Sequence, residues 1–223
     1  MSRRRIYLMR HAQVRYFEGI DPHDVLLTDG GRHQAAAARD ALQEVHFDRV
    51  VTSGLPRTSE TAQIVAPYAN HEREPNLREI ESGELRGLDA NEVQRLMTAA
   101  FRGVVPLDSR FLGGESVGEL FDRALPPFRQ LLAAEDWDVA LVVLHGGVNR
   151  ALLGYALTGE RTFLGGFEQA PGCINVLDVD GDGRFIVRAV NHTPYDPAHV
   201  GAARETTMEQ IWREYLDARE RRT

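Results

Sequence analysis

Short runs of apolar residues alternate along the chain with longer stretches in which apolar residues recur at helical spacing. Five runs have the length and the aliphatic content of strands: Arg5–Met9, Arg49–Thr52, Val139–Leu144, Cys173–Val179 and Arg184–Val190. The Val139–Leu144 run is apolar on both faces, which is typical of an interior parallel strand. The alternation of strands and helices predicts an α/β fold.

Start signals for helices follow two of these regions. Thr28 is suited to cap an Ala-rich helix over Asp29–Glu44. Ser116-Val117-Gly118-Glu119 matches a capping box that begins a helix reaching about Ala134, and Pro126-Pro127 should bend or interrupt that helix. Between the last two strands, Asp180-Gly181-Asp182-Gly183 predicts the turn of a hairpin at one edge of the sheet.

Two segments do not fit this alternation. From about Leu85 to Leu112 the periodicity is weak, so we interpret residues 85–115 as an insertion over the sheet edge, where a substrate lid often lies. Within residues 203–223, one helical face carries most of the apolar side chains: Met208, Ile211, Trp212, Tyr215 and Leu216. We expect that face to dock on the core, and a homodimer contact is the alternative.

Composition contributes mainly exclusions. The 223 residues are 43% hydrophobic and 26% charged, which is ordinary for a globular protein and long enough for a full core in one domain. A net charge of -7 gives no general attraction to nucleic acid or anionic membranes. The single cysteine, Cys173, excludes an intrachain disulfide and a Cys-based metal site, and its apolar neighbours favour a core position.

The chain also shows no targeting signal. No apolar stretch approaches the roughly 20 residues of a membrane helix, and the N-terminus lacks the apolar core of a signal peptide. We therefore expect a cytoplasmic protein with neither a nucleic-acid nor a membrane partner.

Three strand-to-helix junctions carry similar chemistry. Arg10-His11 ends the first strand, Ser53 to Arg57 follows the second, and His145-Gly146-Gly147 ends the most buried one. If these strands are parallel neighbours, the junctions open onto one crevice, because ligands bind at the carboxyl ends of strands in open α/β sheets. Alternatively, Arg10-His11 is a surface dipeptide that happens to follow a strand.

Such a crevice would suit a phosphate. Arg matches phosphate oxygens bidentately and keeps its charge, and a helix N-terminus also favours anions. Ser53 can cap the second helix, Arg57 falls in or just before its first turn, and the paired glycines would let a ligand approach the backbone closely. Local positive charge inside a protein of net negative charge is natural for a phosphate pocket.

Hydrolysis of a phosphomonoester also needs an acid for the leaving oxygen. The segment Asn76–Gly87 supplies three carboxylates soon after the second junction: Glu79, Glu81 and Glu84. All three qualify chemically, and their spacing alone does not choose among them. A solvated acidic turn is the alternative interpretation, favoured for Glu81 and Glu84.

Taken together, these motifs resemble the histidine phosphatase superfamily, which includes the cofactor-dependent phosphoglycerate mutases. Its Arg-His-Gly signature is similar to Arg10-His11-Ala12, and its second motif to the segment Ser53–Ala62. Leu77-Arg78-Glu79 with Gly83…Gly87, Gly113-Gly114-Glu115-Ser116 and His145-Gly146-Gly147 follow in the order of the family, over roughly residues 6–150.

The resemblance implies a three-layer α/β/α sandwich with a mostly parallel central sheet, as one domain over residues 1–223 with the insertion over the active site. It implies a phosphomonoesterase in which His11 becomes a phosphohistidine and Glu79 is the proton donor. Arg10, Arg57 and His145 would hold the phosphate oxygens, with His145 also catalytic. Neither a metal nor another cofactor is implied, because the Arg and His side chains take the place of one.

Departures from the family pattern favour a phosphatase over a mutase. Ala12 replaces a glycine, and Phe17 stands where the mutases place a phosphate-binding Asn. The adjacent Arg pair that mutases use for a carboxylate is missing from the insertion. Candidate contacts to a small phosphomonoester substrate are Phe17, Arg15, Glu115 and His192.

Two other functions stay open. One is a phosphoglycerate mutase-type isomerase, and the other is a catalytically silent relative that binds a phosphorylated ligand. The sequence leaves the physiological substrate and the oligomeric state undetermined.

Overall fold

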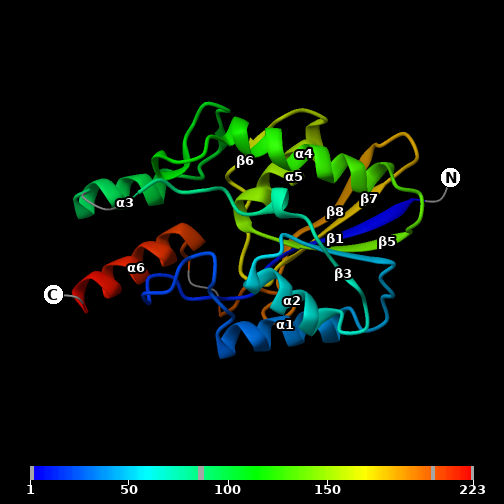
Figure 1. Ribbon diagram of the computed structural model, residues 1–223, viewed down its shortest axis with the longest axis horizontal. Coiled ribbons are helices and arrows are strands. Elements are labelled where there is room, and N and C mark those ends of the chain that lie inside the picture. The colour runs from blue at the N-terminus through cyan, green and yellow to red at the C-terminus, as the bar shows by residue number, and fades with distance from the viewer. Residues whose placement is uncertain (1–2, 85–87, 202–203, 222–223) are drawn as a thin grey trace.

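A mixed six-stranded sheet forms the centre of the molecule in the computed structural model, which describes residues 3–84, 88–201 and 204–221 (Figure 1). The strand order is β3-β2-β5-β1-β7-β8, and a separate two-stranded sheet pairs β4 with β6. The strands are β1 Arg4–Arg10, β2 Arg49–Thr52, β3 His71–Arg73, β4 Val104–Val105, β5 Val139–Leu144, β6 Phe163–Leu164, β7 Ile174–Val179 and β8 Phe185–His192.

Helices cover both faces of the large sheet, with α4 and α5 on one side and α1 and α2 on the other (Figure 1). The helices are α1 Asp29–Ala41, α2 Pro56–Val65, α3 Ala90–Ala99, α4 Val117–Ala133, α5 Gly146–Thr158 and α6 Thr207–Glu220, with short 3₁₀ turns at Pro75–Leu77 and Phe111–Gly113. The predicted three-layer α/β/α fold with a mostly parallel sheet is confirmed.

Alternation along the strands explains the two layers. In β5, Ala140, Val142 and Leu144 join the core beneath α4 and α5, whereas Leu141 and Val143 join the core beneath α1 and α2. Both sets are fully buried, because β5 lies inside the sheet between β1 and β2. The sequence prediction of an interior strand here is confirmed.

The pairing of β1 with its neighbours fixes where the site lies. β1 runs parallel to β5 with Arg10 opposite Leu144, and β2 also runs parallel to β5 with Thr52 opposite Val143. The carboxyl ends of all three strands therefore meet at one edge of the sheet. β7 is antiparallel to β1 and forms the predicted hairpin with β8, which is the outermost strand on that side of the sheet.

Several predicted boundaries differ from the structure. α4 runs unbroken through Pro126 and Pro127, because residues such as Leu125 and Phe128 are held in the core on either side. Thr28 caps α1 as expected, but the helix ends at Ala41, ahead of Glu44. Four short elements were not predicted from the sequence: β3, α3, β4 and β6.

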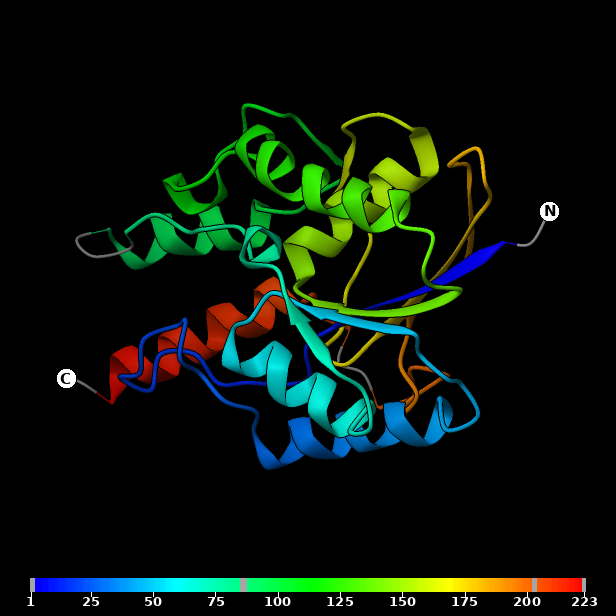
Figure 2. The ribbon, with the colours of Figure 1, turned by 45° about the vertical axis from the view of Figure 1, so that its right-hand side comes forward.

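The C-terminal helix α6 packs on α3 of the insertion (Figure 2). Met208 and Trp212 of α6 share an apolar cluster with Val93 and Met97 of α3, separate from the two cores of the sheet. The expectation that the apolar face docks on the main core is therefore corrected: the insertion covers it. The reason is that α3 presents its own apolar face to the same space.

Some predicted positions lie outside the described residues. These are Leu85 and Gly87 at the start of the insertion, and residues 203, 222 and 223 of the tail. The organisation of residues 1–223 as one domain, with 85–115 as a cap, stays a prediction.

Within residues 3–84, 88–201 and 204–221, no helix is both long and apolar enough to cross a membrane.

Candidate active site

Two buried histidines lie side by side where β1 and β5 end. The backbone N–H of His11 donates to the Leu144 carbonyl oxygen at 2.9 Å, which continues the β1–β5 pairing by one step. His145 is the N-cap residue of α5 and directly follows β5. The two imidazole centroids are 5.3 Å apart, and the side chains are 1% and 0% exposed. The structure thus brings together the two histidines that the sequence singled out.

The ring of His11 has a defined tautomer. Its Nδ1 lies 2.8 Å from the Ala12 carbonyl oxygen, and because a carbonyl only accepts, Nδ1 carries the proton. Nε2 therefore holds a free lone pair. Burial, and then the charges of Arg57 and Arg10, hold the pKa of His11 well below its usual value. His11 is accordingly a neutral imidazole with an available nitrogen.

His145 is oriented by a serine. Its Nε2 lies 2.8 Å from Ser53 Oγ, while its Nδ1 is buried without a hydrogen-bond partner. Burial, followed by the charge of Arg57, lowers its pKa well below the usual range. Ser53 does not cap α2 as the sequence predicted, since the N-cap of that helix is Leu55 and has no side-chain bond. The serine hydroxyl contacts the histidine.

Two arginines complete a cationic cradle. Arg57 lies in the first turn of α2, as predicted, and its Nη1 donates to the Pro22 carbonyl at 2.9 Å. Arg10 ends β1, and its Nη1 donates to the Gln169 carbonyl at 2.6 Å. Both side chains are buried, and the Nε atom of each has no partner. Unpaired buried donors are costly, so these two Nε–H groups are available to an acceptor that enters the site.

The carboxylate of Glu79 lies at the N-terminus of α5. It accepts hydrogen bonds from the Gly147 N–H at 3.0 and 3.1 Å and from the Val148 N–H at 3.3 Å. A Cβ on Gly147 would come within 2.7 Å of Glu79 Oε1. The glycine therefore allows a close approach, as the sequence predicted, but the approaching group in this structure is the carboxylate.

Arg123 of α4 fixes the segment that carries Glu79. Its guanidinium donates to the Arg78 carbonyl at 2.8 Å and the Glu79 carbonyl at 2.9 Å. It also forms a two-bond pair with the Glu115 carboxylate, at 2.6 and 2.7 Å, and Glu115 in turn accepts from the Glu81 N–H. Glu115, a predicted substrate contact, thus holds the Glu79 segment in place.

The remaining candidate substrate contacts lie on the loop after His11 and at the end of the sheet. Arg15 is exposed and pairs with Glu18 at 3.4 Å. Phe17 adopts a left-handed backbone with φ of 66° and packs edge-on against Tyr215 of α6, with ring centroids 5.5 Å apart. His192 is the exposed last residue of β8, where the sequence placed it just after the strand. Their contact with substrate stays a prediction.

Sequence reasoning missed several residues that support the site. Ser53 and Thr58 lie inside a recognised motif, and their mutual hydrogen bond of 3.0 Å next to His145 could have been suspected from it. Arg123, Gln169 and Thr207 carry no local signal. Across residues 3–84, 88–201 and 204–221, no group of three or more His, Cys, Asp or Glu side chains is arranged to hold a metal ion.

The fold and the site define an α/β protein with a buried centre of two histidines and two arginines. A family model described as "Histidine phosphatase superfamily (branch 1)" matches residues 6–192. The chain belongs to the histidine phosphatase superfamily.

Curated relatives of about 30% identity carry phosphatase and mutase names. The chain is 31% identical to a probable 2-carboxy-D-arabinitol-1-phosphatase of Arabidopsis thaliana, over 90% of the chain and 44% of that protein. It is 32% identical to a glucosyl-3-phosphoglycerate phosphatase of Mycolicibacterium vanbaalenii, over 68% and 73%. It is also 32% identical to a probable phosphoglycerate mutase GpmB of Serratia proteamaculans, over 63% and 69%. The chain thus spans less than half of the first of these relatives.

Solved structures agree on the fold. A mycobacterial glucosyl-3-phosphoglycerate phosphatase in complex with VO3 aligns with a TM-score of 0.70 at 24% identity, covering 84% of this chain and 98% of that one. A putative alpha-ribazole-5'-P phosphatase from Escherichia coli aligns with a TM-score of 0.67 at 22% identity, covering 84% and 96%.

Proposed function

We propose that this protein is a metal-independent phosphomonoester hydrolase that works through a phosphohistidine on His11. The observation that carries the proposal is the pair of buried guanidinium nitrogens without partners, Arg10 Nε and Arg57 Nε, beside a neutral imidazole. A dianionic phosphoryl group supplies acceptors for these nitrogens, and its phosphorus is the electrophile that His11 Nε2 requires.

The first step is attack on phosphorus. The lone pair of His11 Nε2 forms the P–N bond while the bond from phosphorus to the ester oxygen breaks. The leaving oxygen takes a proton from the carboxyl of Glu79. In the second step a water molecule gives a proton to Glu79 and attacks phosphorus. The P–N bond then breaks, its electron pair returns to Nε2, and phosphate is released.

The cradle stabilises the charge that develops on the phosphoryl oxygens. Arg10 and Arg57 each present a fixed guanidinium with a free Nε–H, and the buried imidazole of His145 is held beside them by its hydrogen bond with Ser53 Oγ. A well-aimed donor of this kind contributes about 2.7–4 kcal/mol to the transition state. Burial excludes water and strengthens each of these interactions.

A phosphoglycerate mutase-type transfer is the second candidate, since relatives of the chain include proteins named as phosphoglycerate mutases. It would need contacts for a substrate carboxylate beside the cradle. The aromatic ring of Phe17, packed on Tyr215, offers no donor at the position that mutases use, and this favours hydrolysis.

The test is hydrolysis of p-nitrophenyl phosphate in excess EDTA, followed by a panel of natural phosphomonoesters ranked by kcat/KM. We expect turnover to persist in the chelator and His11→Ala to abolish it while the thermal unfolding midpoint stays near that of the wild type. Acid-labile phosphate on rapidly quenched wild-type protein would report the phosphohistidine. Activity that disappears in EDTA and returns with a divalent ion would contradict the scheme, as would wild-type rates in His11→Ala.

Added bisphosphoglycerate separates the two candidates. A hydrolase releases phosphate from phosphoglycerates with little interconversion of the isomers. Efficient interconversion would instead identify a mutase.

A further inference from the structure

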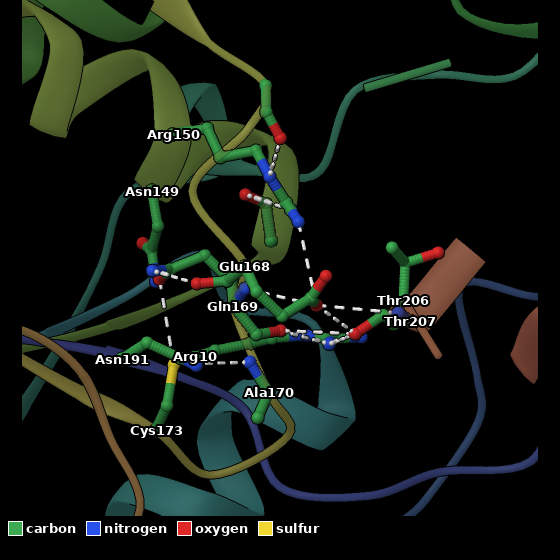
Figure 3. Close-up of polar contacts among 12 residues, drawn as sticks. Arg10, Asn149, Arg150, Glu168, Gln169, Ala170, Cys173, Asn191, Thr206 and Thr207 are labelled. Carbon is green, nitrogen blue, oxygen red and sulfur yellow. Dashed lines mark hydrogen bonds and ion pairs between the residues drawn. The ribbon is translucent and has the colours of Figure 1, made fainter. Parts of the chain in front are cut away.

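The C-terminal helix contacts the phosphate cradle through its first residue. Thr207 begins α6 and is buried, although 197 residues separate it from Arg10 in the sequence. Its hydroxyl oxygen accepts a hydrogen bond from Arg10 Nη1 at 3.2 Å (Figure 3). A group outside the recognised motifs thus contacts an arginine of the site.

The direction of this contact is set by a glutamate. The Thr207 hydroxyl donates its one proton to Glu168 Oε1, which leaves its lone pairs for the Arg10 N–H. Glu168 is itself held by its ion pair with the buried Arg150, at 3.6 Å, and by the Gln169 backbone N–H, at 3.1 Å (Figure 3). The hydroxyl therefore connects a fixed carboxylate to the guanidinium.

This connection determines which edge of Arg10 is free. Nη1 is held by two acceptors, the Thr207 hydroxyl and the Gln169 carbonyl, while Nε is buried without a partner. A guanidinium is planar, so fixing Nη1 also fixes the direction of the opposite edge, which contains Nε. That edge suits two parallel hydrogen bonds to a phosphoryl group.

Packing of the insertion holds Thr207 in place. Met208 and Trp212, which follow Thr207 in α6, lie against α3. Figure 2 shows α6 and α3 together beyond one end of the central sheet. The position of the hydroxyl thus depends on how α6 sits against the insertion.

We propose that Thr207 is a positioning residue that orients Arg10 for the phosphoryl group, so that docking of α6 on the insertion completes the cradle. The inference rests on the proposed function for its kinetic consequences. Its consequence for anion affinity does not require turnover.

The experiment compares Thr207→Val, which keeps the shape but loses the hydroxyl, with Thr207→Ser, which keeps the hydroxyl. Thr206→Val is the matched control, because it removes the neighbouring hydroxyl that caps the same helix. The measurements are kcat and KM for p-nitrophenyl phosphate, the dissociation constant for inorganic phosphate by calorimetry, and the thermal unfolding midpoint.

We expect Thr207→Val to weaken phosphate binding and kcat/KM by about tenfold or more, the range for a hydrogen bond to a charged group. Thr207→Ser should restore both to within about threefold of wild type. Thr206→Val should lower the unfolding midpoint and leave phosphate affinity nearly unchanged.

Wild-type phosphate affinity in Thr207→Val would overturn the inference. Equal losses in the Val and Ser variants, or in Thr206→Val, would also overturn it, because they would indicate packing rather than the hydroxyl. If the wild type binds phosphate without turnover, the hydrolase proposal fails and the phosphate affinities still decide this one. If the wild type does not bind phosphate, both fail.

Discussion

At the scale of single residues, the proposed mechanism makes its sharpest demand on the carboxylate of Glu79, which it uses to carry a proton. Its oxygens accept hydrogen bonds from the backbone N–H groups of Gly147 and Val148, and these bonds orient the carboxylate at the N-terminus of α5 beside His145. An acid in this role matters most when the leaving oxygen is a strong base. It matters least when the leaving group departs easily.

We therefore expect Glu79→Gln to slow hydrolysis of an alkyl phosphate by about 10²–10⁴-fold. Hydrolysis of p-nitrophenyl phosphate should slow much less, because nitrophenolate leaves without protonation. The measurement is kcat/KM for both substrates. Glu81→Gln is the matched variant, since Glu81 is exposed and pairs with Arg78, and we expect it to leave both rates near wild type. Equal losses on both substrates in Glu79→Gln would remove it as the proton donor.

The central residues of the site could be predicted from the sequence because each belongs to a junction whose position the strands determine. His11, Arg10, Arg57 and His145 come together as the junctions implied. The choice of Glu79 over its neighbours needed the family resemblance. Contacts such as Ser53 with His145 depend on side-chain directions 92 residues apart, which spacing does not encode.

At the scale of elements, α4 and the segment from Asn76 to Glu81 act as one unit. Arg123 connects them through three backbone carbonyls and the Glu115 carboxylate. Both charged side chains are largely buried, so neither is well solvated if the other is removed.

Arg123→Leu should lower the free energy of unfolding by about 3–5 kcal/mol, because it leaves Glu115 buried and unpaired. Removing both charges, in Arg123→Leu with Glu115→Leu, should recover part of that loss. Urea unfolding measures both. The control is Asp122→Ala on the same helix, whose exposed pair with Arg161 should contribute less than about 1 kcal/mol. Similar small changes in Arg123→Leu and Asp122→Ala would contradict this account.

Prediction at this scale succeeded where periodicity was strong. The β5 run and the capping box of α4 were found because burial and capping leave local patterns. The helix α3 was not predicted because its apolar stripe is short. The partner that buries this stripe is α6, which lies more than 100 residues away in the sequence. Continuity of α4 through its prolines likewise depends on tertiary packing, which overrides local preference.

At the scale of the whole molecule, two buried neutral imidazoles connect stability to pH. Burial is the largest cause that lowers the pKa of His11 and of His145 below 6.5. At pH values between the folded-state and the unfolded-state pKa of these histidines, their imidazoles are protonated in the unfolded chain but not in the folded chain. Stability is therefore lost as the pH falls below about 6.5.

We expect the free energy of unfolding to fall by about 1.4 kcal/mol per pH unit for each of the two histidines in this window. His11→Asn should halve the part of this pH dependence that the two histidines contribute. Denaturant unfolding between pH 7 and pH 5 provides the measurement. Carboxylates whose pKa is lowered in the folded state, such as Asp178 beside Arg5, also reduce the stability when they become protonated, but only at lower pH. A slope that is the same in His11→Asn would exclude His11 as a contributor.

The layered fold and the location of the site at one sheet edge could be predicted from the order of the strands and helices. The packing of the insertion on the C-terminal helix could not be predicted, because an apolar helix face does not indicate which other segment will cover it. In the structure the insertion and the C-terminal helix pack on each other beside Arg10, and these are the two segments whose position the sequence did not predict.

The register of β1 against β5 has a practical consequence for redesign. His11 and His145 each directly follow a register-paired strand residue, Arg10 and Leu144. The spacing of their backbones is therefore set by the strand pairing, while the Ala12 carbonyl and the Ser53 hydroxyl orient the two rings. An engineer could therefore exchange the loop beyond Ala12 to accept new esters while the two histidines keep their backbone spacing, whereas changes to the insertion or the tail would have to keep Glu115 and Thr207. Lengthening either strand by one residue would turn its histidine to the opposite side of the sheet.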